Sequence, residues 1–190
     1  MTPAHPGVVV LCDANVLYKS LLRDLMVRLG KRGVIQPHWS ERIHEEWMRN
    51  LQLRRPQSSR AAMERTRRLM DEAIPGALVA ITKVSAQILP DPDDQHVLDA
   101  ALSAGASLLL TFNLADFPAS ALPPSVQAVH PDVFLAACLE GQQAGVLESL
   151  RELRADLKRP PFSPDDLLGA MRRAELPAFA AKLQPFRDSL

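Results

Sequence analysis

The sequence predicts an α/β fold in which a parallel sheet is flanked by helices and followed by a helical C-terminal extension. Short apolar runs, such as residues 8–12 and 107–112, are typical of strands buried on both faces. Segments with helical spacing alternate with these runs, which is the order found in parallel sheets. No further strand-like run follows residue 140. We therefore expect a sheet domain over residues 8–138 and a helical extension over residues 140–190.

The first half of the expected sheet domain alternates strand and helix. After the strand at residues 8–12, leucines recur at helical spacing until Gly30, and glycine commonly ends a helix. Residues 34–35 predict a second strand. Ser40 precedes an apolar stripe with positions four residues apart, so we expect it to cap a helix. A further helix is expected over residues 59–73.

The second half continues this alternation and adds the extension. Strand-like runs occupy residues 77–81, 107–112 and 126–129. We expect one helix that is opened by residues 91–94 and ended by Gly105, and another that has Asp132 as its cap. Helical spacing returns over residues 146–157 and 165–183, on either side of a proline-rich link. Their apolar stripe has to be buried, either against the sheet domain or against a bound peptide or a second copy of the chain.

Composition narrows the class of protein. A chain of 190 residues is expected to form about one domain. Lys plus Arg and Asp plus Glu each number 22, so the chain is not a polybasic protein that coats nucleic acid by bulk charge. No apolar run is long enough for a membrane span, and the N-terminus lacks a signal-peptide pattern. Cys12 and Cys138 lack metal-ligand spacing, which favours reduced cysteines in a cytoplasmic protein. The histidines form no metal set, and we expect surface or core roles for His38, His44, His96 and His130.

Polar side chains follow two of the predicted strands at the point where each strand ends. Asp13 comes directly after the first strand, and Asn113 and Asp116 follow the strand at residues 107–112. Ligands of parallel sheets bind beyond the carboxyl ends of the strands, so we expect these side chains at one edge. Asp94 lies in the first turn of an expected helix, where backbone N–H groups also favour an anion.

Two neighbouring glutamates differ in helical phase. At about 100° per residue, Ile43, Trp47 and Leu51 fall within an arc of about 80°. Glu46 lies about 60° from Ile43, at the shoulder of this buried face, whereas Glu45 lies about 160° away in solvent. We therefore expect Glu46, and not Glu45, to reach over the sheet edge.

Together these positions form a set of oxygen ligands. Carboxylates from Asp13, Glu46, Asp94 and Asp116, with Asn113 beside them, would repel one another without a cation. Oxygen ligands of this charge suit Mg²⁺ or Mn²⁺. Such an ion lowers the pKa of a bound water and stabilises a transferring phosphoryl group, which favours phosphodiester hydrolysis. Taken singly, each residue has an ordinary alternative as a helix cap, a solvated helix residue or a turn residue.

Four segments carry a resemblance to a known family. Their sequences are VVVLCDANVLY, SERIHEEWMRNL, LPDPDDQHVLDAAL and LLLTFNLADFP. They occur in the order and spacing of PIN-domain ribonucleases, and the chain resembles the VapC-like toxins of bacterial toxin–antitoxin pairs. The resemblance covers about residues 8–138, the expected nuclease domain. It implies a PIN-like fold, cleavage of RNA with Mg²⁺ or Mn²⁺, and a cognate antitoxin protein as partner; we also weigh a homodimer, and expect no membrane partner.

The resemblance also implies the residues of the site. The metal ligands it implies are Asp13, Glu46, Asp94, Asn113 and Asp116. The carboxylates among these would be catalytic, and the choice between Asn113 and Asp116 as the fourth ligand stays open. Asn15 and Thr111 are expected to support the ligands.

A basic segment lies within this neutral chain. Between Arg49 and Arg68 there are seven arginines and one acid, Glu64, which give a local charge of +6. We expect Arg49, Arg54 and Arg55 to bind the RNA backbone beside the acidic cleft. The alternative is a solvated helix face without a ligand.

Two other functions fit part of the pattern. A haloacid-dehalogenase-like phosphatase would use Asp13 as its nucleophile, but such enzymes carry an acid two residues later, where this chain has Asn15. The second alternative is a non-catalytic helical adaptor, in which the acidic cleft would have no catalytic role. The sequence favours an endoribonuclease, the toxin component of a type II toxin–antitoxin pair, that hydrolyses RNA with metal-activated water.

Overall fold

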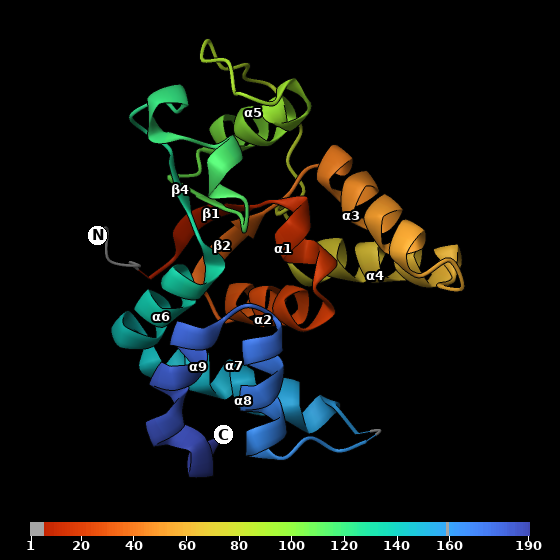
Figure 1. Cartoon of the computed structure of the whole chain (residues 1–190), viewed down its shortest axis with the longest axis vertical. Helices are drawn as coiled ribbons and strands as arrows, with labels where there is room; N and C mark the ends of the chain where they lie inside the picture. Colours follow the sequence, from red (N-terminus) through yellow and green to blue (C-terminus); the bar gives the residue numbers. More distant parts are fainter. Residues whose placement is uncertain (1–5, 159) are drawn as a thin grey trace.

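A computed structural model describes residues 6–158 and 160–190 and shows a parallel sheet at the centre of the molecule (Figure 1). The strands run in the spatial order β2-β1-β3-β4. Their bounds are Val8–Cys12 for β1, Ile35–His38 for β2, Leu108–Leu110 for β3 and Gln127–Val129 for β4. Every neighbouring pair is parallel, which confirms the predicted fold class. The strand order reverses at β1 and β3, and the carboxyl ends of these two strands therefore mark the expected ligand site.

Helices cover the sheet and extend to one side of it. Their bounds are Ala14–Tyr18 for α1, Ser20–Lys31 for α2, Glu41–Arg54 for α3, Arg60–Ala73 for α4 and Gln95–Ala104 for α5. Figure 1 shows α5 and α2 on opposite sides of the sheet, and α3 and α4 as a pair that projects from it. Ser40 caps α3 by accepting a hydrogen bond from the Ile43 N–H at 3.3 Å, and Gly105 ends α5 in a left-handed conformation, as predicted.

The C-terminal region is helical, as predicted, and packs on the sheet domain. Its helices are α6 (Pro131–Gly141), α7 (Gln143–Asp156), α8 (Pro164–Arg173) and α9 (Pro177–Leu183). Helix α7 packs on α2, and α9 packs on α6. The predicted apolar stripe is buried inside the molecule, with Leu150, Leu153 and Met171 fully inaccessible to solvent. Burial of such side chains supplies most of the stabilisation of this interface.

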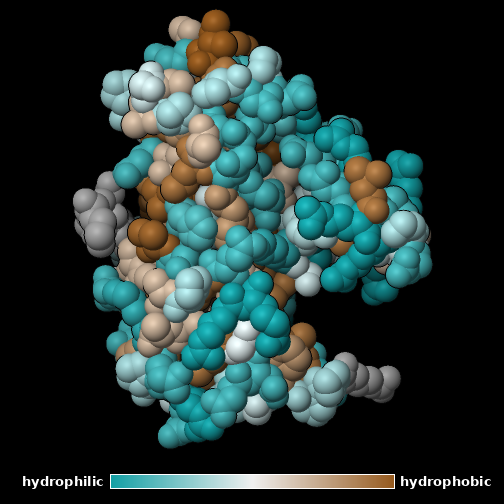
Figure 2. Space-filling model, viewed as in Figure 1, coloured by the Kyte–Doolittle hydropathy of each residue, from teal (hydrophilic) through white to brown (hydrophobic). Residues whose placement is uncertain are grey.

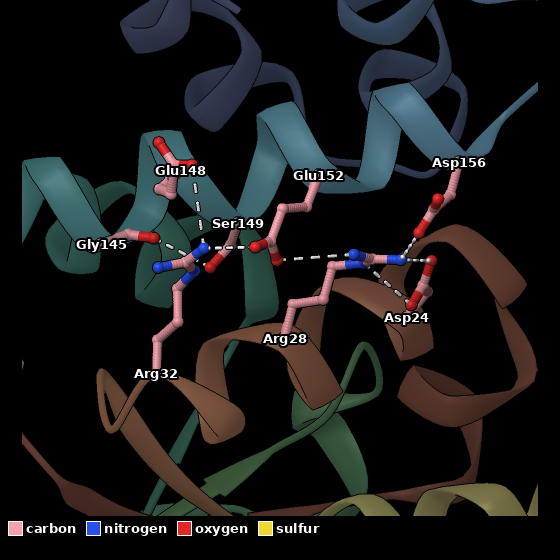
Figure 3. A network of polar contacts seen from close by, with 8 residues as sticks. All are labelled: Asp24, Arg28, Arg32, Gly145, Glu148, Ser149, Glu152 and Asp156. Carbon is pink, nitrogen blue, oxygen red and sulfur yellow. Dashed lines mark hydrogen bonds and ion pairs between the residues drawn. The ribbon is translucent and has the colours of Figure 1, made fainter.

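Ion pairs frame the contact between α2 and α7 (Figure 3). The Arg28 guanidinium lies 3.1 Å from Asp24, 2.8 Å from Asp156 and 3.6 Å from Glu152. Arg32 lies 2.5 Å from the other carboxylate oxygen of Glu152. The acidic partners are about half exposed or more, so each pair contributes little to stability and mainly fixes the register of the two helices.

Four expectations about local structure are wrong. The helix expected over residues 165–183 is interrupted, because α8 ends at Arg173 and α9 begins at Pro177. Residues 77–81 do not form a strand, because β2 ends at His38 and Ser40 already caps α3. Only Trp39 remains to pair, and its partner is Leu78. The helix expected to end at Gly30 is interrupted at Lys19, which separates α1 from α2. The backbone of Lys19 is extended, and its side chain contacts Glu175 in the C-terminal region. His130, not Asp132, caps α6. The Asp132 carboxylate instead accepts hydrogen bonds from the first turn of α9, which explains why it is buried.

The visible face of the molecule is mainly hydrophilic, with separate apolar areas over the α3–α4 pair and above α5 (Figure 2). The largest exposed apolar side chains include Leu53 on α3, which is 72% exposed, and Val84 and Ile88 in the segment before α5. No described helix combines the length and the apolar character that crossing a lipid bilayer requires.

Candidate acidic active site

Asp13 is the centre of a hydrogen-bonded cluster at the carboxyl end of β1. It is 5% exposed and caps α1, where its Oδ1 accepts from the Ala14 N–H at 2.6 Å. Its Oδ2 accepts from Thr111 Oγ1 at 2.7 Å and from Asn15 Nδ2 at 2.6 Å. Asp13 therefore does cap a helix, which was its alternative role. The same carboxylate also uses its second oxygen to contact Thr111 at the end of β3.

Asn15 and Thr111 join the ends of β1 and β3. Asn15 Nδ2 also donates to Thr111 Oγ1 at 2.9 Å, and Asn15 Oδ1 accepts from the Phe112 N–H at 3.1 Å. Thr111 Oγ1 accepts from the Asn113 N–H at 3.0 Å. These contacts hold the Asp13 carboxylate in one orientation, and a fixed acceptor is what a ligand or catalytic carboxylate needs.

The helix phase of Glu46 and Glu45 follows the prediction. Glu46 is half-buried, whereas Glu45 is exposed. Glu46 Oε2 lies 3.5 Å from His96 Nε2, which comes from the first turn of α5. His96 is 6% exposed, and its Nδ1 has no hydrogen-bond partner in the structure. The sequence predicts only a surface or core role for His96, although its position two residues after Asp94 indicates a place near the site.

The electrostatics bring the separate carboxylates into one group. Burial, together with the charges of Asp13, Asp116, Asp91 and Glu46, raises the pKa of Asp94 to about 7. The pKa of Asp13 is raised to about 6, mainly by burial and also by the charge of Glu46, although the hydrogen bonds from Thr111 and Ala14 oppose the rise. Burial is the largest cause of both shifts, and neighbouring negative charge adds to each of them. The charges that act on Asp94 come from the end of β1, from α3 and from η2 (Leu114–Asp116), while Asp94 itself ends η1 (Pro92–Asp94). We call Asp13, Glu46, Asp94 and Asp116 together the acidic field.

The remaining predicted residues lie around this field. Asn113 Nδ2 donates to Asp116 Oδ2, so the two candidates for the fourth ligand form a pair. Asp91 caps η1 by accepting from the Asp93 N–H at 2.9 Å, which agrees with a structural role for this acid. Asp93 is exposed.

The donors fit a hard divalent cation by their chemistry. They are oxygen atoms, and their mutual repulsion is the charge that a cation would neutralise. Across residues 6–158 and 160–190, no three side chains of His, Cys, Asp or Glu already stand in a metal-binding arrangement. The fit therefore rests on the type and charge of the donors.

The basic segment is divided among several surfaces. Arg49 lines a groove of about 520 Å³ between α3 and α4, Arg54 lines a pocket beside Asn15, and Arg55 lies in a third hollow near α8. On α4, Arg67 pairs with Glu41 at 2.6 Å. The +6 charge is therefore partly neutralised by acids from outside the segment, and Arg54 shares a pocket with Asn15, which holds Asp13.

The strand order and the acids at the carboxyl edge of the sheet define a class of α/β proteins. Comparison of the sequence with known protein families identifies that class. The PIN domain family matches residues 9–115, more than half of the chain, and the chain belongs to this family. Residues 131–185 match the VapC50 C-terminal domain. The predicted family and fold are confirmed. The boundary expected between residues 138 and 140 stays a prediction, and the C-terminal match begins with α6 at residue 131.

One relative carries a name that bears on function. A protein of Mycobacterium tuberculosis (strain ATCC 25618 / H37Rv), named "Putative ribonuclease VapC50", is 38% identical to this chain over 90 residues. The match covers 47% of this chain and 53% of the relative, so the chain spans about half the length of the curated relative that it matches. No solved structure matches the chain.

Proposed function

We propose that this protein is an endoribonuclease that depends on Mg²⁺ or Mn²⁺ and acts as the toxin of a type II toxin–antitoxin pair. The observation that carries the proposal is the acidic field, in which carboxylates of separate elements raise the pKa of Asp94, and Glu46 raises that of the buried Asp13. Membership of the PIN domain family and the name of the relative support RNA as the substrate. A cognate antitoxin and a homodimer are proposed as partners on the same resemblance.

Each residue of the site has a proposed role. The metal ligands would be Asp13, Glu46, Asp94 and Asp116, with Asn113 as the alternative fourth ligand. A bound ion lowers the pKa of a water molecule and stabilises charge on the phosphoryl group. Asn15 and Thr111 hold the Asp13 carboxylate in place. Arg49, Arg54 and Arg55 offer positive charge for phosphates along α3, which would position the RNA without reading its sequence.

One assay separates the proposal from its two rivals. The protein is incubated with RNA and with p-nitrophenyl phosphate, each in Mn²⁺ and in EDTA. We expect cleavage of RNA in Mn²⁺ alone and no hydrolysis of the small ester. Hydrolysis of p-nitrophenyl phosphate without RNA cleavage would favour a phosphatase with Asp13 as nucleophile, and inactivity on both substrates would favour an adaptor.

Glu46→Gln is expected to lower RNA cleavage strongly, by about 100-fold, because it removes a charge from the acidic field. Glu45→Gln is the matched control and should leave the rate nearly unchanged, since Glu45 is exposed on the adjacent face of α3. Initial rates in Mn²⁺ measure both variants. Equal losses in the two variants would show that the site does not use the inner face of α3.

The raised pKa values predict that the metal-free protein is less stable at neutral pH. An Asp whose pKa rises from about 4 in the unfolded chain to about 6 or about 7 in the folded chain binds its proton more tightly when folded. This contribution to stability is complete below about pH 4 and is lost as the pH rises through 6 and 7. In EDTA we therefore expect the Tm to fall between about pH 5 and pH 8, and Mn²⁺ at about pH 8 to restore it.

Neighbouring acids supply the control for this pH dependence. Asp94→Asn should flatten the fall in Tm, because Asp94 carries one of the raised pKa values. Asp93→Asn should keep it, because Asp93 is exposed and is not among the charges that raise the pKa of Asp94. The same slope in both variants would argue against a shared acidic field.

A further inference from the structure

A pocket of about 430 Å³ opens directly beside the acidic field. Its walls include Asn15, which holds Asp13, and Phe112, which follows β3. Tyr18 and Lys19 from the end of α1 and Arg54 from the end of α3 complete much of the wall. Figure 2 shows the surface hollowed between the α3–α4 pair and the C-terminal helices. The volume lies within the range of small-ligand sites, so the pocket can take a group of about one nucleotide.

Two cations in this pocket each lie beside an aromatic ring. Lys19 Nζ lies 4.0 Å from the centroid of the Phe112 ring, and Arg54 Cζ lies 5.9 Å from the centroid of the Tyr18 ring. Proteins that bind single-stranded nucleic acid combine cations for the phosphates with rings against which the bases stack. This pocket combines cations with aromatic rings and lies next to the carboxylates of the acidic field. It is therefore suited to one nucleotide of a single strand.

The C-terminal region contributes an acid to the same pocket. Glu175, in the turn between α8 and α9, places Oε1 2.6 Å from Lys19 Nζ, and Lys19 also donates to the Ala174 carbonyl at 3.3 Å. The Glu175 side chain is 68% exposed, so it can move away from Lys19 without disturbing the packing of the hydrophobic core. An anion that binds Lys19 competes with this carboxylate for the ammonium charge.

The backbone of Glu175 is in a conformation that favours glycine. Its φ is 66°, and among the described residues it is the one non-glycine residue with a positive φ. The Leu176 N–H donates to the Met171 carbonyl at 3.0 Å, which is the turn that commonly ends a helix with glycine. A strained residue whose side chain reaches a candidate ligand site points to a function for that side chain.

We propose that this pocket binds one nucleotide of single-stranded RNA beside the bond to be cut. Lys19 and Arg54 hold its phosphate, and the ring of Phe112 or Tyr18 lies against its base. Glu175 competes with the phosphate for Lys19, so the C-terminal region sets the affinity of the nuclease domain for RNA. This inference rests on the proposed function, because it takes RNA as the substrate of the neighbouring acidic field.

Binding of a short single-stranded RNA, measured by fluorescence anisotropy in EDTA, tests the pocket without cleavage. Lys19→Met and Arg54→Met should each weaken binding by about tenfold and lower the salt dependence by about 0.7 per lost phosphate contact. Glu175→Gln should tighten binding by about two- to fivefold. Lys31→Met is the matched control, since Lys31 is exposed at the far end of α2 and should change binding little. Glu175→Gly removes the same carboxylate and suits the backbone, so it should tighten binding while the chain stays folded.

Several outcomes would overturn the inference. They are failure of the wild-type chain to bind the RNA, equal effects of Lys19→Met and Lys31→Met, or a Glu175→Gln variant with lower Tm and unchanged RNA affinity. The last result would make the Lys19–Glu175 pair a structural contact between the two regions. Cleavage in Mn²⁺ is measured separately. If the protein cleaves RNA and the pocket variants leave RNA binding unchanged, only this inference is wrong. If RNA binding changes as expected but no RNA is cleaved, only the proposed function is wrong.

Discussion

Asp13→Asn is expected to reduce RNA cleavage by at least about 100-fold while the chain stays folded. Asp13 is the most buried carboxylate of the acidic field, and its charge would face the metal ion directly. A metal ion stabilises the charge on a reacting phosphoryl group by several kcal/mol, and each 1.4 kcal/mol corresponds to about tenfold in rate. Loss of one ligand charge should remove much of that stabilisation. Initial rates in Mn²⁺, compared with those of the wild-type chain, measure the effect.

A second measurement on the same variant reports on metal binding without activity. Mn²⁺ should raise the Tm of the wild-type chain, because it binds the folded state alone, and should raise that of Asp13→Asn much less. Without metal, the variant should be about as stable as the wild-type chain: it loses a carboxylate whose pKa is raised by burial, but also acceptors for Asn15 and Thr111. Asp93→Asn is the control. An Asp13→Asn variant that cleaves at the wild-type rate would show that the metal site lies elsewhere.

The sheet and its edge could be predicted because the patterns that specify them are local. A buried parallel strand is a continuous apolar run, and residues 8–12 show this pattern without reference to any other segment. The helix phase that separates Glu46 from Glu45 also depends on one element. Asp13 follows its strand in the sequence, so its place at the carboxyl edge follows from the fold class alone.

Contacts between distant segments could not be predicted, because no local pattern encodes them. The carboxylate of Asp132 resembles a cap for its own helix, yet it binds the N–H groups of Ala178 and Phe179. Lys19 reads as one more residue of a long helix, but its partner is Glu175, 156 positions later. The run at residues 77–81 has strand composition, but its neighbour β2 had already ended. In each case tertiary geometry decides between several local possibilities.

Removal of residues 160–190 is expected to leave a chain that does not fold stably. Helices α8 and α9 bury Leu167, Met171, Phe179 and Leu183, each fully inaccessible to solvent. Burial of a large apolar side chain is worth about 1.5–3 kcal/mol, so the four together contribute on the order of 10 kcal/mol. The total stability of a domain is about 5–15 kcal/mol. Solubility and the near-ultraviolet circular dichroism of the truncated chain test this expectation.

Two point variants measure how much the packing of the C-terminal helices contributes to stability. Phe179→Ala should lower the free energy of unfolding by about 3–5 kcal/mol, because the lost ring leaves a cavity between α9 and α6. Val133→Ala on α6 should change it by less than about 0.5 kcal/mol, since Val133 is 51% exposed. Urea unfolding measures both. A truncated chain that stays folded and cleaves RNA but loses its antitoxin or its oligomer would instead make α8 and α9 a docking surface, because only a face without a structural partner can be removed at no cost to the core.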